Sequence, residues 1–76
     1  MNRTLPTSHT FGNRTLVPVK DGLWRVVDRS GAVLGHVERR TDAAGERYAA
    51  RRLLAASRTY DLGLFWRLGD AVDCFR

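Results

Sequence analysis

The sequence predicts a small α+β domain, in which a three- or four-stranded antiparallel β-meander packs against one C-terminal α-helix. Two observations indicate this class. β-branched and aromatic runs separated by turn residues begin at Leu23, and an amphipathic stripe occupies the last part of the chain. A chain of 76 residues forms one domain at most and has a small core.

The C-terminal segment 62–75 is the best candidate for the helix. At helical spacing its apolar residues form one stripe and its polar residues the opposite side. The stripe contains Leu64, Phe65, Leu68, Ala71, Val72 and Phe75, and the polar side contains Arg67, Asp70, Asp73 and Cys74. A helix this short is not stable alone in water, so it requires a sheet to pack against. Alternatively, residues 61–65 form a fourth strand and the helix begins near Leu68.

Three strands precede this helix. Residues 23–28 and 32–40 flank Arg29-Ser30-Gly31, which is typical of a hairpin turn. A second turn is predicted at residues 41–45, followed by a third strand over 46–54. The Ala, Arg and Leu content of this last segment also fits a helix, but the two regularly spaced turns favour a meander.

Residues 1–21 are rich in Thr, Asn and Ser and show no sustained periodicity, which predicts a flexible N-terminal leader before a single domain at 22–76. Thr15-Leu16-Val17 is the exception, because it could add a short edge strand before Pro18.

A hairpin that closes with Asp28 opposite Ala32 sets the register of the first two strands. Val26 then pairs with Leu34 and Trp24 with His36, while Arg40 pairs with Glu46 across the second turn. The predicted core face carries Trp24, Val26, Leu34, Tyr48 and Ala50, and the other face carries Arg25, Arg39, Arg47 and Arg51 around Gly35. A bulge at Gly35 would instead shift the register by one residue and move Val37 into the core.

Several classes of function lack support in the sequence. Cys74 is the only cysteine, so no internal disulfide forms, and no Cys/His spacing resembles a metal site. No segment resembles a signal peptide or a membrane span, so a cytoplasmic protein is expected. No catalytic spacing is present, which predicts a protein that is not an enzyme and that binds no cofactor. His36 is expected to pair with Trp24 or Tyr48.

The strongest functional cue is the basic character of the middle of the chain. The net charge is +5, and residues 39–58 contain six arginines against two carboxylates. A sheet face rich in arginine fits nucleic acid, because guanidinium groups neutralise phosphates and bind guanine. DNA is expected to be a better candidate than RNA. The predicted contacts are Arg25, Arg39, Arg47 and Arg51 on the face and Arg40, Arg52 and Arg58 at its border.

Two alternatives to nucleic-acid binding remain open. The arginines could form a solvated face whose aliphatic stems cover the apolar residues between them. Alternatively, the chain is a protein-interaction module or a homodimer that uses the apolar part of this face, a free sheet edge or an exposed Trp66. Recognition of single strands by stacking is not expected, because no aromatic residue interleaves with the arginines of the predicted face.

The order of a Trp-containing strand, two further strands and Leu62-Gly63-x-Phe65 before a helix with Ala71 resembles AP2-type and phage-integrase arm-type DNA-binding domains. The resemblance covers about residues 22–76 and implies that the exposed face of a three-stranded sheet enters the major groove. In this sequence the helix start is Trp66-Arg67-Leu68-Gly69-Asp70, which differs from the acidic, alanine-rich start of AP2-type domains. The chain is also similar to small uncharacterised proteins of GC-rich bacteria and their phages, which implies no function.

Overall fold

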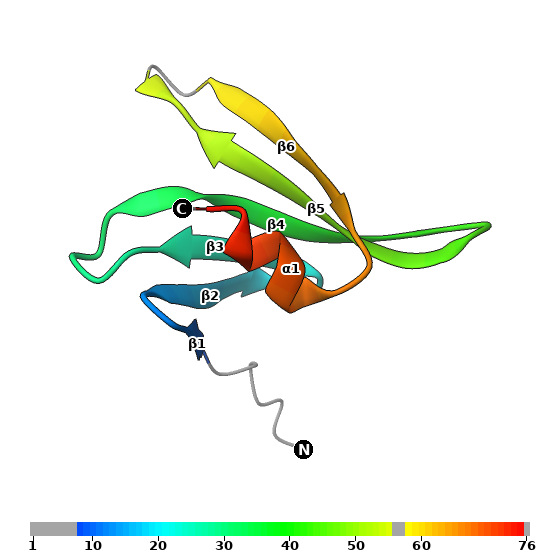
Figure 1. The fold of residues 1–76 in the computed structure, drawn as a ribbon, viewed down its shortest axis with the longest axis horizontal. Helices are drawn as coiled ribbons and strands as arrows, with labels where there is room; N and C mark the ends of the chain where they lie inside the picture. Colours follow the sequence, from blue (N-terminus) through cyan, green and yellow to red (C-terminus); the bar gives the residue numbers. More distant parts are fainter. Residues whose placement is uncertain (1–7, 56–57, 76) are drawn as a thin grey trace.

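A computed structural model describes residues 8–55 and 58–75. Within these residues, six strands form one antiparallel sheet in sequence order, and one helix follows them (Figure 1). The strands are β1 (His9–Phe11), β2 (Arg14–Lys20), β3 (Leu23–Val27), β4 (Val33–Asp42), β5 (Gly45–Leu53) and β6 (Thr59–Phe65), and the helix is α1 (Leu68–Asp73). The α+β class and the meander are confirmed, but the sheet has more strands than the predicted three or four.

The additional strands lie in the segment that was predicted to be a flexible leader. Residues 9–20 form β1 and β2, and Leu16 of β2 pairs with Val26 and is fully buried. Pro18 is accommodated because the register of β2 and β3 is irregular between Pro18 and Lys20. The leader prediction is therefore wrong for residues 9–20, and residues 1–7 lie outside the described part of the chain.

The first predicted hairpin is present, with a bulge in its second strand. The Asp28 carboxylate accepts hydrogen bonds from the Ser30 N–H and hydroxyl at 2.8 and 2.7 Å and from the Ala32 N–H at 3.0 Å, and Gly31 has a φ of 92°. These contacts hold the turn and also lower the pKa of Asp28, the Ser30 hydroxyl having the largest effect.

Past this turn, the register differs from the simple prediction. Val26 pairs with Gly35 and Trp24 with Val37, because Leu34 is an extra residue between the Val27–Val33 and Val26–Gly35 pairs. The predicted pairs of Val26 with Leu34 and Trp24 with His36 are wrong. The predicted alternative, a register shifted by one residue, is confirmed, although the extra residue is Leu34 and not Gly35. Val37 is therefore completely buried.

The second hairpin is tighter than predicted. Asp42 pairs with Gly45, so the turn contains only Ala43 and Ala44, and Arg40 pairs with Arg47 rather than with Glu46. Because paired residues share a face of the sheet, Arg40 and Arg47 lie together on one face and Arg39 and Tyr48 on the other. The segment after the turn is strand β5, as predicted.

The core lies on the face of the sheet that α1 covers (Figure 1). The fully buried cluster contains Leu16, Val26, Val37, Ala50, Ala71, Val72 and Phe75. Gly35 belongs to this face and not to the opposite one, since a Cβ on Gly35 would lie 2.6 Å from the Phe75 ring and would collide with the Arg51 carbonyl oxygen. Gly35 thus makes room for Phe75.

The end of the chain follows the alternative that starts the helix near Leu68. Residues 59–65 are β6, so Leu64 and Phe65 are strand residues and not part of a helical stripe. Ala71, Val72 and Phe75 face the core as predicted. Cys74, expected on the polar side, is half-buried, and its thiol donates to the Ala71 carbonyl at 2.9 Å. Burial raises the pKa of this thiol.

Candidate nucleic-acid interface

The face of the sheet opposite α1 carries a group of basic side chains, and no other described element covers it (Figure 1). Strand alternation and register place Arg25 of β3, His36 and Arg40 of β4, and Arg47 and Arg51 of β5 on it. Arg25, His36 and Arg51 form one row across three strands, and Arg40 pairs with Arg47. We call this surface the open face.

Three of the four arginines predicted for this face, Arg25, Arg47 and Arg51, lie on it. Arg39 does not, because the bulge at Leu34 places it on the same face as Gly35 and Val37. There the Arg39 guanidinium lies 3.1 Å from Asp21 and 3.7 Å from Glu46. The predicted position of Arg39 is wrong, and Arg40, predicted at the border, takes its place.

The two remaining border residues lie off the open face. Arg52 pairs with Gly35 and so shares the face that α1 covers. Arg58 is exposed and precedes β6, where its carbonyl accepts a hydrogen bond from the Leu54 N–H. Four of the seven predicted contact residues are therefore together on the open face.

Carboxylates accompany three of these four arginines. Glu38 lies 3.4 Å from Arg40, Asp42 lies 3.2 Å from Arg47, and Asp61 lies 3.4 Å from Arg51. Exposed ion pairs of this kind contribute only about 0–1 kcal/mol each, so the guanidinium groups can exchange a carboxylate for a phosphate. The same carboxylates leave the open face with a smaller net positive charge than its arginines alone would give.

Trp66 adds an aromatic ring to the open face. The Cζ atom of Arg47 lies 4.7 Å from the centroid of the Trp66 ring, within the range of a cation–π contact, and Trp66 is 62% exposed. The expectation that no aromatic residue interleaves with the arginines is therefore wrong. The register explains the contact: Tyr48 pairs with Phe65, so the next residues outward, Arg47 and Trp66, lie on the opposite face of the sheet.

A shallow hollow of about 310 Å³ lies next to these groups, lined by Arg40, Ala49, Ala50, Asp61, Gly63 and Leu64. Ala49 pairs with Leu64 and is nearly buried, whereas Leu64 is half-exposed. The open face thus combines arginines with an apolar area made of Ala49, Leu64 and Trp66.

His36 lies in the middle of the basic row. Burial, and then the positive charges of Arg25 and Arg51, lower the pKa of His36 below its usual value of 6.5, which favours the neutral imidazole. The expected pairing of His36 with Trp24 or Tyr48 is wrong, because those two rings lie on the other face, 6.1 Å apart between centroids.

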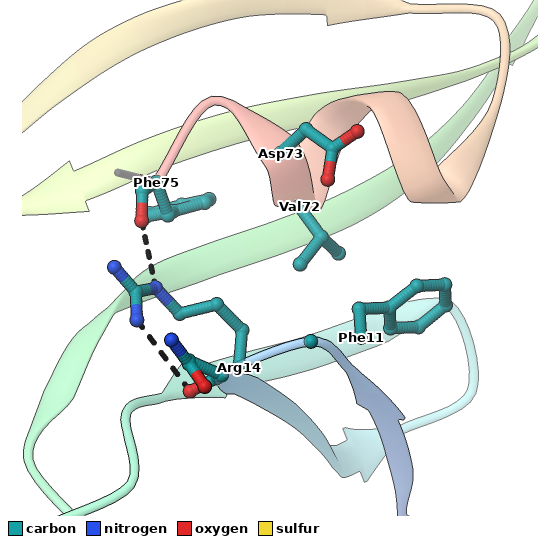
Figure 2. A pocket seen from close by; sticks show the side chains of 7 residues that line it. Phe11, Arg14, Val72, Asp73 and Phe75 are labelled. Carbon is teal, nitrogen blue, oxygen red and sulfur yellow. Dashed lines mark hydrogen bonds between the residues drawn. The ribbon is translucent and has the colours of Figure 1, made fainter.

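A second hollow, of about 290 Å³, lies between the β1–β2 turn and the end of α1 (Figure 2). Its lining residues are Phe11, Gly12, Asn13, Arg14, Val72, Asp73 and Phe75. The Arg14 Nε donates a hydrogen bond to the Phe75 carbonyl at 2.7 Å, and its Nη1 donates to the Asn13 carbonyl at 3.4 Å. The guanidinium therefore ties the C-terminal end to β2, and we assign this hollow a structural role.

Within residues 8–55 and 58–75, no group of three or more His, Cys, Asp or Glu side chains could hold a metal ion. The short helix of this region lacks the length and apolar character needed to cross a membrane. Comparison with protein-family models, with curated proteins and with solved structures finds no match to this chain.

Proposed function

We propose that this chain is a non-enzymatic accessory protein that binds nucleic acid through the open face. The observation that carries this proposal is the gathering of Arg25, Arg40, Arg47 and Arg51 on the one sheet face that α1 leaves uncovered. The resemblance to AP2-type and integrase arm-type domains suggests the same surface of the sheet as the binding site and makes DNA the first ligand to test.

Phosphate chemistry supports this use of the face. Each guanidinium that replaces a counterion on the nucleic acid makes a favourable contribution that weakens as salt is added. Arg25 is exposed, and the carboxylates beside Arg40, Arg47 and Arg51 are themselves accessible to solvent, so phosphate can compete for all four groups.

The first test reverses charge on the open face away from Trp66. We expect Arg25→Glu and Arg51→Glu, alone and together, to weaken binding to a labelled oligonucleotide. Each should also lower the slope of log affinity against log salt by about 0.7–0.9. The matched control is Arg29→Glu, which makes the same charge change in the exposed turn between β3 and β4. Equal losses in the three single variants, Arg25→Glu, Arg51→Glu and Arg29→Glu, would show that only net charge matters and would contradict a site on the open face.

The open face also supports a second candidate function, binding of a protein. Trp66 and Leu64 are large exposed apolar side chains beside nearly balanced charges, which is typical of protein interfaces. If no oligonucleotide binds at low salt, this candidate replaces the first. In that case, measurement of the oligomeric state of the wild type and of Trp66→Ala shows whether the partner is a second copy of the chain.

A further inference from the structure

On the open face, the exposed Trp66 ring has the Arg47 guanidinium on one side. We infer that the open face binds single-stranded nucleic acid and that an unpaired base stacks on the exposed side of the Trp66 ring. This inference rests on the proposed function, and it names the class of nucleic acid that the site takes.

The ring is held in position from one side. The Arg47 guanidinium stacks against Trp66 at 4.7 Å, and its Nη2 donates a hydrogen bond to the Asp42 carboxylate at 3.2 Å. The Arg47 Nε is buried and has no hydrogen-bond partner among the described residues. With one side covered by Arg47 and 62% of the residue exposed, the other side of the ring is open to a ligand.

The charge balance of the open face favours the same ligand. Three of its four arginines have a carboxylate within 3.4 Å, which limits the attraction to phosphates alone. Tight binding at such a site needs a favourable contribution to the binding free energy that salt does not screen. Stacking of a base on an aromatic side chain supplies this contribution. The bases inside a duplex are stacked on each other and offer no free ring face, whereas a single strand does.

The apolar area extends this stacking surface. Leu64 lies two residues before Trp66, and it lines the hollow above Ala49 together with Arg40. A nucleotide next to the stacked base can place its sugar or base against Leu64 and Ala49, while the Arg40 guanidinium contacts the phosphate between them. The hollow therefore fits a strand that runs along β6 past Trp66.

The test compares four labelled oligonucleotides of equal length, about 12 nucleotides, which is within the range of small single-strand-binding folds. They are a mixed-sequence DNA single strand, the same strand in a duplex, an RNA strand of that sequence, and an abasic strand that keeps the phosphates but has no bases. Affinity is measured by fluorescence anisotropy at two salt concentrations. The proteins are the wild type, Trp66→Leu, Trp66→Phe and, as a control, Tyr60→Leu, which removes another aromatic residue of equal exposure.

We expect the single strands to bind more tightly than the duplex and the abasic strand. Trp66→Leu should weaken single-strand binding about tenfold to hundredfold, while Trp66→Phe keeps a ring and loses less. Tyr60→Leu should bind like the wild type. The intrinsic fluorescence of the wild type should be quenched on binding, and that of Trp66→Phe, which retains only Trp24, should not change. The DNA and RNA arms show which single strand is preferred.

Three results would overturn the inference. Equal or tighter binding of the duplex, or unchanged binding by Trp66→Leu, would exclude stacking while leaving the proposed function in place, provided that Arg25→Glu and Arg51→Glu still weaken binding. The absence of binding to all four oligonucleotides would exclude both the inference and the proposed function.

Discussion

His36 illustrates how single residues of the open face influence one another. It pairs with Arg25 on one side and with Arg51 on the other, and it is partly buried between them. Burial is the main cause of its lowered pKa, and the two arginines add to the effect. The folded protein therefore binds a proton at His36 less readily than the unfolded chain does.

This difference makes the stability of the fold depend on pH. Because the pKa of His36 is lowered in the folded state, its contribution to stability is complete above the unfolded value of 6.5. It is lost as pH falls through the lower, folded value. We expect the free energy of unfolding, measured by urea denaturation, to decrease between about pH 7 and pH 5.

Two variants isolate the contribution of His36. His36→Gln should remove this part of the pH dependence, and Arg25→Gln should reduce it only partly, because burial remains. A profile of His36→Gln that is identical to that of the wild type would contradict the assignment to His36. The same row of residues provides a check on binding, since phosphates beside His36 would favour its protonated form.

At the level of the elements, the position of Gly35 in β4 decides how α1 packs on the sheet. The Phe75 ring and the Arg51 carbonyl occupy the space that a Cβ on Gly35 would need. Gly69, in the first turn of α1, is different, because the nearest atom to its Cβ would be a Phe11 ring carbon at an ordinary contact distance of 3.7 Å.

Alanine at these two glycines should therefore have opposite effects. We expect Gly35→Ala to lower the free energy of unfolding by about 3 kcal/mol or more, because it forces β5 and Phe75 apart. Gly69→Ala should raise it by about 0.5–1 kcal/mol, because alanine has the higher helix propensity. Urea denaturation of both variants measures the two effects. A mild effect of Gly35→Ala would show that Phe75 does not lie against Gly35.

The errors in the predicted elements have a common physical origin in side-chain parity. A single extra residue at Leu34 reverses which side chains of β4 face the core, so Val37 is buried and Arg39 leaves the open face. The turn residues Ser30 and Gly31 were recognisable, but the bulge depends on how Gly35 fits beneath Phe75, which is a tertiary contact. β1 was missed, and β2 was predicted only as a possible short edge strand at Thr15-Leu16-Val17, because Leu16 is the only fully buried residue of these two strands and their apolar alternation is weak.

At the scale of the whole molecule, the candidate site was partly predictable, because it depends on both composition and register and only the composition can be read from the sequence. The excess of arginine in residues 39–58 was visible in the sequence, and four of the seven predicted arginines share the open face. The contact of Trp66 with Arg47 depends on the register of β5 and β6, which a single sequence does not fix. The carboxylates beside the arginines come from β4 and β6 and approach the arginines only in the folded sheet, so composition alone overstated the positive charge of the surface.

Because the core cluster lies on only one side of the sheet, a few buried residues contribute much of the free energy of unfolding. Phe75 is fully buried, lies on Gly35, and is held by the hydrogen bond from Arg14 to its carbonyl (Figure 2). We expect Phe75→Ala to cost about 3–5 kcal/mol. Because the total stability of small domains is about 5–15 kcal/mol, this variant should be partly unfolded at physiological temperature, as monitored by circular dichroism.

Two controls separate the loss of packing from the loss of an aromatic group. Phe75→Leu keeps most of the buried volume and should cost less than about 1.5 kcal/mol, if the neighbouring side chains adjust. Tyr60→Ala removes an aromatic side chain that is 62% exposed and should change stability by less than about 0.5 kcal/mol. If Phe75→Ala were as stable as Tyr60→Ala, α1 would not be part of the core. Stability would then come from the sheet alone, and the face that α1 covers would be accessible to ligands, as the open face is.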